Sequence, residues 1–228
     1  MTVQRRQFLS IAISVAVFPM PLQIASAQTS STQPVPIAHQ VDFAPIADVK
    51  DGQSVGLAVD VVRAAATRAG IEVTFVPVPF EHVQRTLENG RAVAIFPLAI
   101  TPERRQQFDF SAPLYEGGGG LYVRAPAPTP ESLAALSGKV VVTPRTGPLA
   151  AFIERTAPTV KLVVTKDYEE SLQQLVRGDA DAAALNFYVG RVLAARLYPG
   201  QITLPRTFSL QASTGTGLGV AKVNRLTS

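Results

Sequence analysis

The sequence predicts an α/β fold of two lobes, each a mainly parallel β-sheet flanked by helices, with a central cleft between them. Three observations support this prediction. Strand and helix patterns alternate from residue 35 to residue 98, the proline-rich segment 125–130 interrupts them, and the alternation then restarts and continues to residue 197. Two such units side by side place a ligand beyond the carboxyl ends of their strands.

The first lobe is predicted to span residues 28–124 and to follow a β-α-β-α-β order. Apolar residues recur at helical spacing before Gly70, which suits a C-terminal cap, and a second short helix closes at Gly90. The expected elements are a strand at 35–41, a helix at 61–69, a half-exposed strand at 71–75, a helix around 83–87 and a strand at 93–98.

The second lobe is predicted to span residues 125–208, and residues 209–228 are predicted to return to the first lobe. Pro148 suits the first position of a helix, and Gly178 suits a helix end. The expected elements are a helix from 129 to 136, strands at 140–142, 162–164 and 181–185, helices from 148, around 172–176 and at 187–197, and a returning strand at 217–220.

The first 27 residues have the pattern of an export signal. Arg5 and Arg6 precede an apolar run at 8–18, and Ala25-Ser26-Ala27 has the small residues of a cleavage site. The run is too short to span a bilayer, so stable membrane insertion is not expected. The sequence predicts a periplasmic protein cleaved after Ala27, by either the twin-arginine or the general secretory route.

Composition narrows the possible functions. The chain has no cysteine, and its two histidines, His39 and His82, are far apart and predicted to lie at the surface, so neither a metal site nor a cofactor is expected. Without Arg5 and Arg6 the net charge falls from +4 to +2. The sequence contains no cluster of basic residues of the kind that binds nucleic acid, so a nucleic-acid partner is not expected. The run Gly117–Gly120 lacks phosphate-loop spacing and is interpreted as a flexible or close-packed connection.

The turn after strand 93–98 suggests a small-anion site. Thr101, Pro102 and Glu103 have the residue types of an N-cap, a first helical position and a first-turn acid. Arg104 adds a planar cation whose fork suits a carboxylate. The alternative is an ordinary strand-to-helix turn with a surface arginine.

Further motifs make the chain resemble the periplasmic solute-binding proteins of family 3, the polar amino-acid type that serves ABC transporters. These motifs are Gly56–Asp60, Leu87–Gly90, Ile100–Arg104, Phe110–Pro113, Leu136–Val140 and Leu175–Ala182. The resemblance implies a periplasmic-binding-protein-like fold whose lobes close on a small polar or anionic solute by hinge motion. It also implies a monomer that passes the solute to an inner-membrane ABC permease or reports it to a sensor.

The resemblance also implies a set of ligand-binding residues. Phe43 and Phe80 match the aromatics that hold the ligand side chain, and Arg104 matches the arginine that binds its carboxylate. Core packing is the alternative for both phenylalanines. The remaining positions of the implied set are Pro97, Ala99, Gly147 and Asn186.

Three of these positions depart from the family pattern. Ala99 replaces a hydroxyl residue, Pro148 replaces the threonine after Gly147, and Asn186 replaces the acid that pairs with the ligand ammonium. A buried ammonium without its carboxylate costs several kcal/mol, so the pattern favours a carboxylic acid over an α-amino acid. The alternative is a shifted pocket in which another acid supplies the charge, with Asp179, Asp181 and Glu116 as candidates.

Other functions remain open from the sequence. Cyclohexadienyl dehydratases resemble these proteins closely, and their chemistry needs a positioned acid or base, for which Asp42, Glu81 and Glu116 are the candidates. We predict a binding protein without catalytic residues, and an accessory protein of an exported redox enzyme is a third alternative. The family's last helix has no counterpart after strand 217–220, so we expect either a shortened variant or a truncated reading frame.

Overall fold

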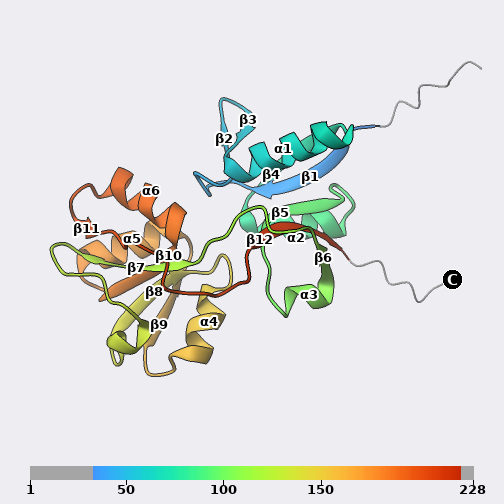
Figure 1. Ribbon diagram of the computed structural model, residues 1–228. Coiled ribbons are helices and arrows are strands. Elements are labelled where there is room, and N and C mark those ends of the chain that lie inside the picture. Colours follow the sequence, from blue (N-terminus) through green and yellow to red (C-terminus); the bar gives the residue numbers. More distant parts are fainter. Residues whose placement is uncertain (1–32, 222–228) are drawn as a thin grey trace, which may run out of the picture. The chain divides into compact units, whose positions relative to one another are not determined.

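The computed structural model describes residues 33–221, which form two five-stranded sheets and a small hairpin (Figure 1). The predicted export signal and residues 222–228 lie outside the described residues. Each sheet is flanked by helices on both faces, as the alternating sequence pattern predicts for an α/β fold. No helix of the described part is long and apolar enough to cross a membrane.

The sheet of the first lobe has the strand order β4-β1-β5-β12-β6. Strands β4, β1 and β5 are parallel, and β12 runs antiparallel to both β5 and β6. The elements of this lobe are β1 (Val35–Gln40), the hairpin β2 (Asp48–Lys50) and β3 (Gln53–Val55), α1 (Leu57–Ala69), β4 (Val73–Val78), α2 (Phe80–Glu88), β5 (Ala94–Ala99), α3 (Arg104–Gln107), β6 (Phe108–Phe110) and β12 (Thr216–Ala221).

Helices α1 and α2 cover opposite faces of this sheet (Figure 1). The buried side of α1 packs with Ile37 and Phe96, whereas Val83 of α2 packs with Ala38 and Ile95. Helix α1 ends where the sequence predicts, because Gly70 adopts the left-handed conformation and its N–H bonds the last carbonyls of the helix. The central strands are therefore buried on both sides.

The sheet of the second lobe has the strand order β11-β7-β10-β8-β9. Strands β10, β8 and β9 are parallel, while β7 runs antiparallel to both β10 and β11. Helices α5 and α6 cover one face, and α4 with η1 covers the other. The elements are β7 (Gly119–Arg124), the 3₁₀ helix η1 (Leu133–Leu136), β8 (Val140–Pro144), α4 (Leu149–Thr156), β9 (Lys161–Thr165), α5 (Tyr168–Arg177), β10 (Ala182–Asn186), α6 (Phe187–Leu197) and β11 (Ile202–Thr203).

The boundary between the lobes lies earlier than the predicted position at residue 125. Strand β7 belongs to the second sheet, so the chain has already crossed before Gly119. The proline-rich segment 125–130 is instead a largely exposed connection between β7 and η1. Its composition marks a loop, but a loop within a lobe has the same composition as a loop between lobes.

The two crossings of the chain lie against each other. Tyr115 forms a bridge with Thr216, and Gly119 forms another with Leu210, where their backbones exchange hydrogen bonds of 2.8 and 3.0 Å. The run Gly117–Gly120 is close-packed, because a Cβ added at Gly118 would lie 2.6 Å from the Leu210 carbonyl oxygen. The second crossing follows Leu210, near the predicted start of the return segment at residue 209.

His39 is fully buried in β1, and the prediction of a surface histidine is wrong. Its ring packs against both Phe75 and Phe96, with Nδ1 2.9 Å from the Gln40 carbonyl oxygen and Nε2 2.7 Å from Ser54 Oγ. Burial lowers the pKa of His39, although the Gln40 carbonyl and Asp48 oppose the effect. A strand covered on both faces shows no alternation of apolar and polar residues, so the sequence pattern could not place this side chain.

Candidate ligand-binding site

A cavity of about 610 Å³, part of it open to solvent, lies between the two lobes. Its walls come from the carboxyl ends of strands β1, β4, β5, β8, β9 and β10 and from both crossings of the chain. This is where an α/β sheet is expected to hold a ligand. The lining residues are Gln40, Phe43, Phe80, Pro97, Ala99, Arg104, Tyr115, Gly117, Gly118, Gly119, Thr146, Gly147, Pro148, Leu149, Tyr168, Asn186, Ala212, Ser213 and Thr216.

All seven residues of the predicted ligand-binding set line this single cavity. The first lobe contributes Phe43, Phe80, Pro97, Ala99 and Arg104, whereas the second lobe contributes the other two, Gly147 and Asn186. The fold therefore brings residues that are far apart in the sequence to one cavity. Phe43 and Asn186, for example, are 143 residues apart.

Arg104 is the only ionised side chain among the described residues that line the cavity. It is half-buried, and its Nη1 donates a 3.1 Å hydrogen bond to the Ala99 carbonyl oxygen. Burial lowers the pKa of Arg104, with the Glu103 carboxylate opposing the shift, but a guanidinium stays protonated at any physiological pH. No ion pair within residues 33–221 involves Arg104, so its charge is available to a ligand.

The predicted helix after Thr101 is only a single turn, α3. Thr101 Oγ1 accepts a 3.3 Å hydrogen bond from the Arg104 backbone N–H, as a capping residue would. A four-residue turn sums too few peptide dipoles to attract an anion strongly. Attraction of an anion to this corner therefore depends on the guanidinium rather than on a helix N-terminus.

Asn186 ends β10 and caps helix α6 with its side chain. Its Oδ1 accepts hydrogen bonds of 3.0 Å from the Tyr188 N–H and 3.1 Å from the Val189 N–H. Both acceptor positions of that oxygen are thereby used. The side chain can offer the cavity only the N–H donors of Nδ2.

Hydroxyl groups, together with the Gln40 amide, supply the other polar side-chain groups of the cavity wall. Thr146 Oγ1 is buried without a hydrogen-bond partner, and the Tyr168 hydroxyl interacts with it only outside hydrogen-bonding geometry. Burial raises the pKa of Tyr115 to about 12 and also raises that of Tyr168, so both phenols stay neutral. The predicted set omits Tyr115, Tyr168, Thr146 and Gln40, which also line the cavity. No motif marked them, because each belongs to a loop or element whose direction depends on the packing of its lobe.

Aromatic rings from both lobes form part of the wall. Phe43 of the first lobe lies with its ring centroid 6.1 Å from that of Tyr168 of the second, at an angle of 59°. Phe80 begins α2 and is half-buried at the cavity rather than in the core. Both phenylalanines line the cavity, and Phe43 also packs against the hydrophobic core, the alternative considered from the sequence.

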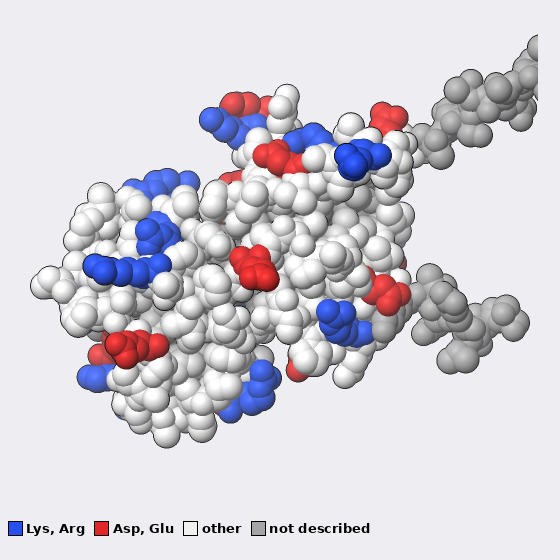
Figure 2. Space-filling model, in the orientation of Figure 1, with Lys and Arg blue, Asp and Glu red and all other residues white. Residues whose placement is uncertain are grey.

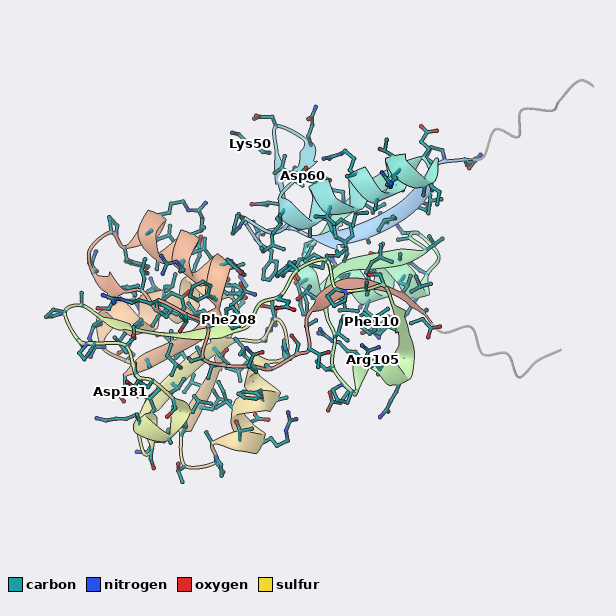
Figure 3. The ribbon with its side chains drawn as sticks, viewed as in Figure 1. Lys50, Asp60, Arg105, Phe110, Asp181 and Phe208 are labelled. Carbon is teal, nitrogen blue, oxygen red and sulfur yellow. The ribbon has the colours of Figure 1, made fainter. Side chains whose placement is uncertain are left out.

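None of the acids considered from the sequence lines this cavity. Glu81, Glu116 and Asp179 are exposed, and Asp181 accepts a 2.8 Å hydrogen bond from the Val140 N–H at the far end of the second lobe (Figure 3). Asp42 lines a separate cavity on the other side of Tyr168, together with Asp48, Asp167, Glu169 and Arg196. On the face shown in Figure 2, basic and acidic side chains are interspersed without a continuous basic patch.

Comparisons with known proteins agree with this architecture. A model of the bacterial extracellular solute-binding proteins, family 3, matches residues 35–182. ABC transporter arginine-binding protein 1 of Escherichia coli is 27% identical over 75% of this chain and 70% of that protein. A solved structure of an ancestral arginine-binding protein bound to arginine has a TM-score of 0.71 and 25% identity, covering 84% of this chain and 85% of that one.

A further relative contains this kind of domain within a longer chain. Membrane-bound lytic murein transglycosylase F of Aeromonas hydrophila is 29% identical over 58% of this chain, but the match spans only 28% of that protein. The similarity therefore concerns the shared domain.

Proposed function

Because the chain belongs to the bacterial extracellular solute-binding proteins, family 3, we propose that it captures a small organic anion in the periplasm for an ABC-type importer. The cavity between the lobes is the binding site, and Arg104 holds the carboxylate of the ligand. The inner-membrane permease of the importer is the proposed partner. The similar Escherichia coli protein is named as an ABC transporter binding protein, which supports this part of the proposal.

The charge of Arg104 is the observation that carries the proposal. A half-buried guanidinium with one backbone hydrogen bond and no ion pair within the described residues has most of its N–H donors free. A carboxylate satisfies these donors in a bidentate arrangement. Such charge-assisted bonds contribute about 1.5–3 kcal/mol each in a site that excludes water.

The rest of the cavity suits a ligand with a small apolar body. Phe43 and Phe80 present aromatic surface from the first lobe, and Leu149 and Pro148 present apolar surface from the second. A few polar groups among apolar walls fix the orientation of a bound molecule. Closure of the two lobes around such a ligand would bury it on both sides.

The second candidate function is that of an enzyme with the same fold. The similarity to a domain of the murein transglycosylase supports considering it. Acid–base catalysis needs a titratable group within hydrogen-bond reach of the substrate. The lining residues offer only the phenols of Tyr115 and Tyr168 and the guanidinium of Arg104, whose pKa values lie far from neutrality. Conversion of prephenate or arogenate to product by the purified protein would favour the enzyme.

The test uses two neighbouring arginines. Arg104→Ala removes the proposed anion contact, whereas Arg105→Ala removes a cation that stacks on Phe110 at the β6 edge, 5.8 Å from the ring centroid (Figure 3). Isothermal titration of the mature protein with a panel of carboxylic and amino acids gives the dissociation constants. We expect Arg104→Ala to weaken binding about 100-fold or more, since 1.4 kcal/mol corresponds to a factor of ten.

Arg105→Ala is expected to leave the dissociation constants within about twofold. Equal affinities of wild type and Arg104→Ala would contradict the proposed site. Equal losses in both variants would show that overall charge, rather than this corner, determines binding.

A further inference from the structure

We infer that the ligand is a carboxylic acid carrying a hydroxyl or carbonyl oxygen, but no ammonium, beside its carboxylate. Arg104 binds the carboxylate, while Asn186 Nδ2 and Thr146 Oγ1 of the second lobe donate to the additional oxygen. The inference rests on the proposed function and names the substrate class of the same cavity. It differs from the arginine named for the similar binding proteins, which is an α-amino acid.

Charge balance is the first argument. The described lining residues carry one positive charge, that of Arg104, and no negative charge. A ligand with a single carboxylate makes the filled cavity neutral, whereas a zwitterionic amino acid leaves it with a net positive charge. A buried ammonium without a carboxylate partner is strongly unfavourable, because neutral oxygens do not repay the loss of its hydration.

The capping bonds of Asn186 give the second argument. The only acceptor atom of this side chain is held by two backbone N–H groups of α6, at 3.0 and 3.1 Å. Rotating the amide to face the cavity with its oxygen would leave both N–H groups of the helix end unpaired. Asn186 therefore presents donors to the ligand, which an ammonium cannot use and an oxygen acceptor can.

Thr146 provides an independent observation on the same side. Its Oγ1 is buried and has no partner of standard hydrogen-bond geometry within residues 33–221, although the Tyr168 hydroxyl interacts with it. Buried hydroxyls are rarely left unpaired in folded proteins, so an unpaired one at a cavity wall indicates a missing partner. The Thr146 residue lies in the loop after β8, one residue before Gly147 and directly beside the cavity.

Three of the four acids that line the neighbouring cavity, Asp48, Asp167 and Glu169, have partners of their own. Asp48 Oδ1 accepts the Asp42 and Val49 N–H groups, and Asp167 Oδ1 caps α5 through the Glu170 N–H. Glu169 lies 3.8 Å from Arg196. Tyr168, only 7% exposed, stands between these acids and the binding cavity, so they do not supply the missing negative charge.

The experiment compares ligands that differ only at the carbon next to the carboxylate. The two sets are pyruvate, lactate, propionate and alanine, and phenylpyruvate, phenyllactate, 3-phenylpropionate and phenylalanine. For wild type we expect the oxo or hydroxy acid to bind about tenfold more tightly than the plain acid, and at least about 100-fold more tightly than the amino acid. Isothermal titration of the mature chain measures each dissociation constant.

Three variants give the specificity test. Asn186→Asp keeps the cap, because aspartate is as good an N-cap as asparagine, and adds a second oxygen that can pair with an ammonium. We expect it to bind the amino acids at least tenfold more tightly than wild type and the oxo acids more weakly. Asn186→Ser, a capping residue without the carboxylate, and Thr146→Val are expected to weaken the oxo and hydroxy acids without improving the amino acids.

The outcomes separate the two proposals. Tighter binding of alanine or phenylalanine than of the matched oxo and hydroxy acids, lost in Arg104→Ala, would overturn this inference and leave the proposed function intact. Binding of no member of either set, or binding that ignores Arg104→Ala, would overturn the proposed function itself. An unchanged amino-acid affinity in a folded Asn186→Asp would also overturn the role assigned to Asn186.

Discussion

Gly118→Ala tests whether the two crossings of the chain need direct backbone contact. A Cβ at Gly118 would lie 2.6 Å from the Leu210 carbonyl oxygen and 3.1 Å from the Phe208 ring, which lies beside the crossing in Figure 3. The carbonyl belongs to the backbone and cannot rotate away. The same segment carries the bonds between Gly119 and Leu210, of 2.8 and 3.0 Å, so a shift of one crossing stretches both.

The expected cost follows from these contacts. Overpacking typically costs about 1–3 kcal/mol, and each of the two weakened backbone bonds contributes about 0.5–1.5 kcal/mol. Alanine also restricts the unfolded chain, which stabilises the fold by about 0.4–1 kcal/mol. We therefore expect the free energy of unfolding to fall by about 1–5 kcal/mol, equivalent to roughly 2–20 °C in Tm at about 2–4 °C per kcal/mol.

Gly117→Ala is the matched control. Its Cβ would meet only the rings of Tyr115 and Tyr188, at 3.3 and 3.4 Å, which can move by a few tenths of an ångström. Urea denaturation of the mature chain, followed by far-ultraviolet circular dichroism, gives the free energy of unfolding of both variants. If Gly118→Ala proved as stable as Gly117→Ala, the close backbone approach of the two crossings would be wrong.

Two further predictions concern the buried His39 and the half-buried Asp167. The pKa of His39 is lowered in the folded chain, so the unfolded chain takes up a proton first as the pH falls. The contribution of His39 to the free energy of unfolding should therefore be full above pH about 6.5. Below that pH the free energy of unfolding should fall, by at most about 1.4 kcal/mol per pH unit. His39→Gln should remove this slope in denaturation between pH 5 and 7, whereas exposed His82→Gln should keep it; equal slopes in wild type and His39→Gln would refute the reasoning. Asp167→Ala removes the cap bond to the Glu170 N–H and should cost about 1 kcal/mol, measured by urea denaturation, against no change in exposed Asp179→Ala. A loss of the same size in Asp179→Ala would point to charge rather than capping.

The cavity shows how far local patterns reach. The motif around Arg104 and the resemblance that it carries were enough to predict seven residues that the structure brings to one cavity. Tyr115, Thr146 and Tyr168 could not be predicted in the same way. Each follows a strand or begins a helix like many other residues, and only the meeting of the two lobes turns it toward the cavity.

The sequence by itself determined the α/β class, the two-lobe plan and most element positions. Those properties depend on residue spacing, turn residues and caps such as Gly70 and Gly178, which act over a few neighbouring residues. The tertiary structure alone decided that β7 belongs to the second lobe, that His39 is buried and that the Asn186 oxygen is used as a cap. Strand pairing, burial and hydrogen-bond partners depend on segments distant in sequence, which no local pattern encodes.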